Sequence, residues 1–248
     1  MSDPLQPLVD LPGVREAADA ARDALAAVHR HKANRRGWPT TAAEAAVRAA
    51  RSSAAIEGAS TELPADGRVS DPVLAGSLRV GQALDAEALT NLVGTWQRAP
   101  LQALARLHLL AAADLVADEQ ELGRPRSGPG VAERLDLLVQ TVQTSKAPAP
   151  VIAAVVHGEL LALRPFGTAD GVVARGASRL VAVASGLDPH SLGVPEVFWL
   201  RRRQAYADAA AGFAQGTAEG VGGWVIFCSG ALEDGAREAT SIAEAASQ

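Results

Sequence analysis

The chain has 248 residues, enough for one large domain with a substantial core; 48% of them are hydrophobic and 21% are charged. A formal net charge of −5 argues against a nucleic-acid-binding protein, which usually carries a basic surface. The one cysteine, Cys228, excludes an intrachain disulfide, and neither a signal peptide nor a membrane-spanning apolar run is recognisable, so we expect a soluble, cytoplasmic protein.

The N-terminal quarter of the chain is predicted to form two helices joined by a basic connection. Apolar residues at three- and four-residue spacing predict the first helix over residues 13–31. The segment HRHKANRRGWPT follows, and Pro39 near its end indicates a connection. The second helix is expected over about residues 42–58. One of the two threonines before it is expected to cap its start, the second as part of a capping box, and Gly58 is expected to end it.

The rest of the chain is predicted to be helical between turn-rich loops. Residues 59–71 and the segment GRPRSGPG at 123–130 carry too much proline and glycine for helices. Further helices are expected at residues 72–98, 101–117, 131–144, 149–163, 171–186, 195–213 and 217–245. Strand signals are nearly absent. The predicted fold class is therefore all-α, one compact domain with an N-terminal helical region (residues 1–62) and a helical core (residues 72–248).

A loop between two of these helices resembles the signature of the Fic (Fido) family. Residues 164–175 read RPFGTADGVVAR. The family signature is His-Pro-Phe, two variable residues, Gly-Asn-Gly-Arg, two more and Arg. Pro165, Phe166, Gly171 and Arg175 match it in register. The resemblance implies a Fic-like helical core.

The surrounding sequence extends the resemblance to roughly residues 42–235. An apolar helix with His157 leads into the signature, as in the family, although we expect His157 to be a hydrogen-bonded core residue rather than a ligand. Residues 123–126 are similar to the family's Gly-x-x-Arg loop, which follows a helix containing Leu-His. Downstream, VFWLRRRQAYADAAAGFAQG and GGWVIFCSGAL resemble the helix ending in a tyrosine and the tryptophan-bearing final helices.

A second pattern lies at the end of the helix expected over about residues 42–58. Ser53, three small or apolar residues, Glu57 and Gly58 resemble the family's inhibitory helix, which reads Ser or Thr, three residues, Glu, then Gly or Asn. In relatives with this helix before the core, the glutamate reaches the last signature arginine and blocks the γ-phosphate of the nucleotide. The resemblance therefore implies a clasp between Glu57 and Arg175. We expect a buried or half-buried ion pair that joins the N-terminal helix to the core.

Most residues that carry the family's chemistry are replaced in this chain. Arg164 stands for the histidine that takes a proton from the target hydroxyl, and a guanidinium has no acceptor atom. Thr168 stands for the acidic residue that holds magnesium. Ala169, Asp170 and Val172 stand for the glycine, asparagine and arginine that contact phosphate. We expect Asp170 to cap the helix that Gly171 opens and to form an ion pair with Arg164.

The resulting prediction is a catalytically degenerate Fic-like protein that acts as a binding or regulatory module for an unknown protein partner. No cofactor, metal, nucleic acid or membrane is expected to bind it. The alternative is a divergent transferase that uses a nucleotide or another phosphoryl donor, with ATP and magnesium as cofactors, to modify a protein hydroxyl under inhibition by Glu57. A third hypothesis is a structural homodimer.

Overall fold

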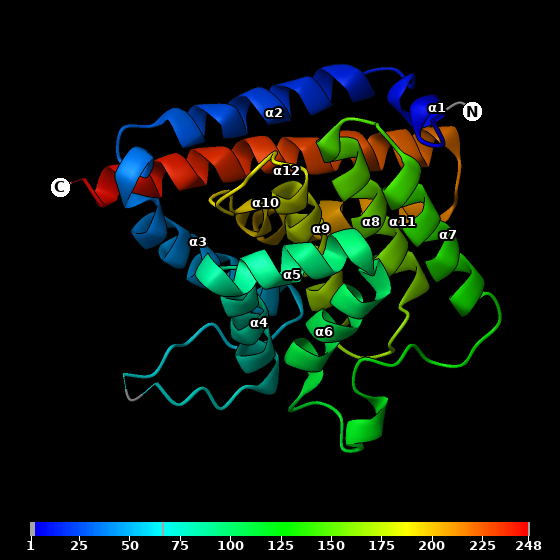
Figure 1. The fold of residues 1–248 in the computed structure, drawn as a ribbon, viewed down its shortest axis with the longest axis horizontal. Helices are drawn as coiled ribbons and strands as arrows, with labels where there is room; N and C mark the ends of the chain where they lie inside the picture. Colours follow the sequence, from blue (N-terminus) through cyan, green and yellow to red (C-terminus); the bar gives the residue numbers. More distant parts are fainter. Residues whose placement is uncertain (1–2, 66, 248) are drawn as a thin grey trace.

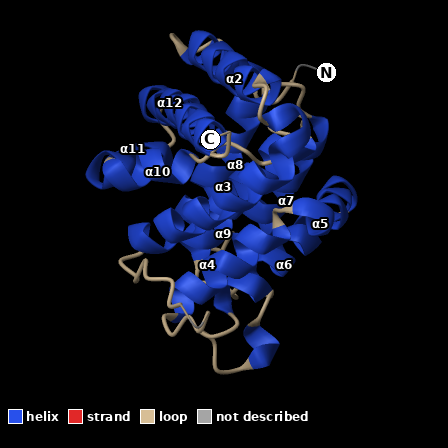
Figure 2. Ribbon diagram, turned by 90° about the vertical axis from the view of Figure 1, so that its left-hand side faces the viewer, coloured by secondary structure: helices blue, strands red, loops and turns tan. Residues whose placement is uncertain are grey.

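The computed structural model describes residues 3–65 and 67–247, and within these ranges the backbone forms helices and loops without a strand (Figure 2). The helices are α1 (Gln6–Val9), α2 (Val14–Arg30), α3 (Asn34–Ile56), α4 (Pro72–Ala83), α5 (Ala86–Arg98), α6 (Pro100–Ala112), the 3-10 helix η1 (Glu119–Glu121), α7 (Val131–Thr144), α8 (Ala149–Leu163), α9 (Asp170–Ala184), α10 (Pro195–Arg201), α11 (Arg203–Ala214) and α12 (Ala218–Ala245). The predicted all-α class is confirmed. Among the described residues, no helix combines the length and the apolar character that a membrane crossing requires.

Helix α9 lies at the centre of the molecule. Its residues 172–182 are all buried, as in a helix that is covered on every side. The largest hydrophobic cluster surrounds it with side chains from α4, α5, α6, α7 and α8. Because α9 carries Arg175 and Arg179 among these buried residues, the protein must supply internal partners for two guanidinium groups.

A second cluster lies between α12 and the helices beside it. Trp199, Tyr206 and Trp224 form its aromatic centre, and the Trp224 Nε1 donates to the Ala154 carbonyl of α8 at 2.7 Å. Helix α2 lies along α12 in both views, and the sequence colours of Figure 1 show that the two helices run in the same direction (Figures 1 and 2). Helix α3 then turns down to pack on α4, α10, α12 and α9. The N-terminal helices therefore contact the core along much of their length.

The predicted connection around Pro39 is wrong, because Pro39 lies inside α3. The helix already begins at Asn34, whose side-chain amide donates to the Val28 carbonyl at 2.9 Å. The predicted capping box is also wrong, since the Thr41 hydroxyl donates to the Asn34 Oδ1 at 2.8 Å instead of capping a helix start. These buried side-chain contacts offset the one backbone bond that a proline removes.

Two predicted long helices are each broken in two. Residues 72–98 form two helices instead of one. Helix α4 ends at Ala83, and α5 begins after Asp85, whose backbone is extended (φ −123°, ψ 149°). The helix expected over 195–213 breaks at Arg202, whose guanidinium lies 4.1 Å from the centre of the Phe198 ring. Helical periodicity continues across both breaks, so it cannot reveal them.

Candidate functional site

The motif loop, defined as residues 164–169, joins the end of α8 to the start of α9. It is bounded by two non-glycine residues in the left-handed region, Arg164 (φ 48°) and Ala169 (φ 51°). An alanine in this conformation costs roughly 1–2 kcal/mol because its Cβ approaches the backbone. The alanine at the position of the family's glycine therefore keeps a backbone geometry that suits glycine.

Arg126 holds the motif loop in place. Its guanidinium donates from Nε to the Arg164 carbonyl at 2.8 Å and from Nη2 to the Leu163 carbonyl at 2.9 Å. Its backbone N–H donates to the Pro165 carbonyl at 2.7 Å. The side chain thus satisfies two carbonyls that the end of α8 leaves without helical partners. Arg126 belongs to the loop that resembles the family's Gly-x-x-Arg loop, but its sequence pattern did not predict this role.

Thr168 is bound to a histidine of α6. The backbone N–H of Gly123 donates to the His108 Nδ1 at 2.9 Å, so the ring carries its proton on Nε2 and donates it to the Thr168 hydroxyl at 3.0 Å. The His108 ring stacks on Phe166 at 4.2 Å between centroids, and burial lowers the pKa of His108. The threonine thus faces a neutral hydrogen-bond donor. Sequence reasoning missed the role of His108, for which the only signal was the Leu-His pair in α6.

Asp170 differs in two respects from its prediction. It is the first residue of α9 rather than its cap, and its Oδ1 accepts a hydrogen bond from the backbone N–H of Phe166 at 2.9 Å, on the loop side. The predicted ion pair with Arg164 is wrong, because among the described residues no Arg164 nitrogen lies within ion-pair distance and Oδ2 has no hydrogen-bond partner. Burial raises the pKa of Asp170, although the charges of Arg164 and Arg126 act in the opposite direction.

The ion pair predicted from the sequence is present between Glu57 and Arg175. The Arg175 Nη2 lies 2.6 Å from the Glu57 Oε1; the arginine side chain is 1% exposed and the glutamate 36%. Arg175 also donates from Nε to the Ser53 hydroxyl at 2.8 Å and from Nη2 to the Ser53 carbonyl at 3.2 Å. Its Nη1 contacts the Tyr206 hydroxyl at 3.4 Å. Arg175 therefore ties α3, α9 and α11 together.

The end of α3 aims the Glu57 carboxylate at the start of α9. Gly58 follows in the left-handed conformation (φ 87°) and ends the helix as predicted. The carboxylate lies against Gly171, where an added Cβ would be 2.2 Å from the Glu57 Oε1. Both Glu57 and Asp170 thus place a carboxylate at the positive end of α9, the position that favours anions.

His157 continues the same network into the core. Its Nε2 lies 2.8 Å from the Tyr206 hydroxyl, and the ring is completely buried, in agreement with the predicted core role. Burial, with a smaller contribution from the Arg175 charge, lowers the pKa of His157 well below its ordinary value. Desolvation likewise raises the pKa of Tyr206. Both groups are neutral near pH 7.

This neutral histidine predicts a loss of stability in acid. The unfolded chain protonates His157 near pH 6.5 and the folded chain does not, so the unfolded state binds more protons and stability falls as the pH drops below 6.5. Between pH 7.5 and 5.5 we expect the free energy of unfolding to fall by about 1.4 kcal/mol more in the wild type than in His157→Gln. Urea unfolding at both pH values measures this difference. An equal pH dependence would show that folded His157 takes up the proton.

Two spaces adjoin the site. A void of about 20 Å³, room for roughly one water molecule, lies between α3, α4 and α9 beside Ser53, Ser77 and Arg175. A hollow of about 460 Å³ lies beside the motif loop, and Arg124, Ser127 and Thr168 are among its lining residues. Within the described residues, no group of three His, Cys, Asp or Glu side chains is arranged to hold a metal ion.

A solved structure shares this fold. No family model matches the chain, and no curated protein does. The chain is similar to a Fic family protein from Desulfovibrio desulfuricans G20, with a TM-score of 0.73 and 21% identity over 93% of this chain and 74% of that one. The chain therefore has a Fic-like, all-α fold, as the signature residues predicted.

Proposed function

We propose that this protein is a Fic-like pseudoenzyme, a binding or regulatory module that no longer transfers AMP. The contact between Glu57, Arg175 and Gly171 carries the proposal. The Glu57 carboxylate lies on the first turn of α9, where the resemblance would place the nucleotide's phosphates. It also binds the Arg175 guanidinium, which would otherwise contact those phosphates. The site is therefore neutralised by the protein's own side chains.

The replaced residues support the same conclusion. Arg164 cannot accept a proton, which alone costs on the order of 10²- to 10⁴-fold in rate if a histidine served there as general base. Thr168 offers a neutral hydroxyl, hydrogen-bonded to His108, where a carboxylate would hold magnesium. Val172 is 2% exposed and packs in the hydrophobic cluster around α9, so it supplies no anion contact.

Calorimetric titration with ATP tests the proposal, with and without magnesium, on the wild type, Glu57→Gly and Glu62→Gly. Glu62→Gly is the matched control, because it removes an exposed glutamate from the nearby loop. We expect no binding by any of the three at about 1 mM nucleotide, since Asp170 and Val172 still oppose phosphate after Glu57 is removed. A parallel assay with labelled ATP should show no AMP transfer. Transfer by Glu57→Gly would overturn the proposal.

A divergent transferase is the second candidate function. It is favoured by the hollow of about 460 Å³ beside Thr168, which is lined by Arg124 and by the hydroxyl-bearing Ser127. An arginine can stabilise a transferring phosphoryl group even though it cannot act as a base. ATP binding by Glu57→Gly, with none by the wild type or by Glu62→Gly, would favour this candidate.

A further inference from the structure

The turn from α2 into α3 presents four exposed cations within seven residues. We define them as the basic corner: Arg30, Lys32, Arg35 and Arg36. In the part of the chain that the structure describes, none of the four has an ion-pair or hydrogen-bond partner. The net charge of the chain is −5 including these four positive charges, so the remaining residues sum to −9. The basic corner is therefore a local exception on an acidic protein.

The position of these cations works against the helix that carries them. Arg35 and Arg36 lie in the first turn of α3, which contains no acidic residue, and its cap residue Ala33 forms no side-chain hydrogen bond. Helix starts favour acidic residues and capping side chains, and α4 has such a cap in Asp71. Residues that are unfavourable for the local structure, and that no other contact within the protein stabilises, are expected at functional sites. An anion from a binding partner would supply the negative charge that the start of α3 lacks.

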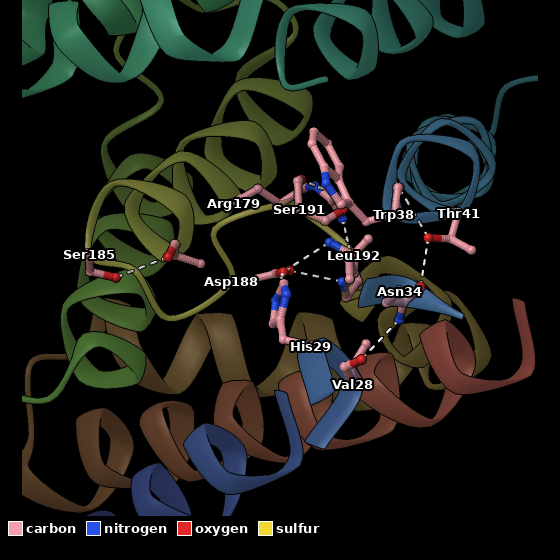
Figure 3. Close-up of polar contacts among 12 residues, drawn as sticks. Val28, His29, Asn34, Trp38, Thr41, Arg179, Ser185, Asp188, Ser191 and Leu192 are labelled. Carbon is pink, nitrogen blue, oxygen red and sulfur yellow. Dashed lines mark hydrogen bonds and ion pairs between the residues drawn. The ribbon is translucent and has the colours of Figure 1, made fainter. Parts of the chain in front are cut away.

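The backbone of the basic corner is anchored by buried contacts. Asn34 lies in the middle of it, is 3% exposed, and bonds to the Val28 carbonyl and to Thr41, so it joins the end of α2 to the body of α3 (Figure 3). Trp38, one turn further on, stacks on His190 at 4.0 Å between ring centroids. A backbone anchored in this way adds little to the entropy that is lost when a partner binds.

The buried acid that contacts the end of α2 is already engaged. Asp188 accepts hydrogen bonds from the His29 Nε2 at 2.8 Å and from the backbone N–H groups of Leu192 and Gly193 (Figure 3). Burial alone would raise the pKa of Asp188, but these donors lower it below its usual value. The carboxylate is thus committed to His29 and to the loop after α9, and it does not neutralise the basic corner.

We propose that the basic corner binds a short acidic segment of a partner protein. Three of its four cations are arginines, whose planar guanidinium pairs with a carboxylate through two parallel hydrogen bonds. The extent of the corner suits a few carboxylates. A long polyanion such as a nucleic acid would extend past these four cations onto a protein whose remaining residues carry a net charge of −9, which opposes its binding.

Fluorescence anisotropy with a labelled peptide of four glutamates tests this proposal on the full chain. We expect binding at about 50 mM salt that weakens at about 200 mM. Arg35→Gln/Arg36→Gln should weaken it by about tenfold or more. The matched control is Arg98→Gln/Arg106→Gln, which removes two exposed arginines from α5 and α6 and should bind as the wild type does.

Two further measurements keep the test decisive. Thermal melting of Arg35→Glu/Arg36→Glu should give a Tm equal to or above that of the wild type while peptide binding is lost, because acidic residues suit the first turn of a helix. A labelled oligonucleotide of ten thymidines serves as the competing probe. Equal loss of peptide binding in the control variant, no peptide binding by the wild type, or tighter binding of the oligonucleotide would overturn the proposal.

Discussion

Replacing Arg175 by methionine is expected to lower the free energy of unfolding by about 3–5 kcal/mol. The guanidinium is 1% exposed, and its removal leaves the Ser53 hydroxyl and carbonyl and the Tyr206 hydroxyl without this donor. Each unsatisfied buried group costs about 1–3 kcal/mol, and methionine recovers part of the packing. Urea unfolding followed by circular dichroism measures the change.

Two variants show whether the loss comes from burial or from the ion pair. Glu57→Gln should cost only about 1 kcal/mol or less, because the Glu57 side chain is 36% exposed and water screens the lost charge. Arg134→Met, which breaks the exposed ion pair with Glu159, should also cost about 1 kcal/mol or less. A loss in Arg175→Met no larger than in Arg134→Met would show that Ser53 and Tyr206 readily find other partners.

Gly76→Ala is expected to destabilise the protein by about 2 kcal/mol or more. A Cβ at this position of α4 would lie 2.0 Å from the Ala111 carbonyl oxygen of α6. Alanine normally stabilises a helix interior by about 1 kcal/mol relative to glycine. The clash outweighs this gain because the obstacle is backbone and cannot rotate away, so the two helices must separate. Chemical unfolding measures the free energy, and circular dichroism reports the helix content.

Gly223→Ala provides the matched control within α12. Its added Cβ meets nothing within 4 Å, and the residue is exposed. Here only the helix preference remains, so we expect a gain of about 0.5–1 kcal/mol. A Gly76→Ala protein that is as stable as Gly223→Ala would contradict the close approach of α4 and α6.

The sequence predicts this fold well where one pattern controls one helix. The Ser53-to-Gly58 pattern predicted both the end of α3 and the ion pair with Arg175, because it specifies a helix end and a carboxylate together. The segment around Pro39 was predicted wrongly because side-chain hydrogen bonds decide its structure, and the spacing of apolar residues does not reveal them. Asn34 reaches back to α2 and forward to Thr41, which keeps the segment around Pro39 helical against its local preference.

The site was predicted less completely than the fold. The signature identified which positions of the motif loop have changed, but it could not say what the new side chains contact. Asp170 turned toward Phe166 rather than Arg164, and His108 and Arg126 hold the loop from segments far away in the sequence. Such contacts depend on how α6, α8 and α9 pack, which a local pattern does not contain.

The bonds between Arg175 and the residues Ser53 and Glu57 also determine whether parts of the chain can unfold separately. A core starting at residue 72 would keep Arg175 inside α9 but lose both residues of α3 that bind it. We therefore expect the predicted regions on either side of residues 62–72 not to fold independently of each other. If α3 separated from the core, the Arg175 guanidinium would be exposed to water or left without its partners. We therefore expect the N-terminal helices and the core to unfold in one cooperative transition.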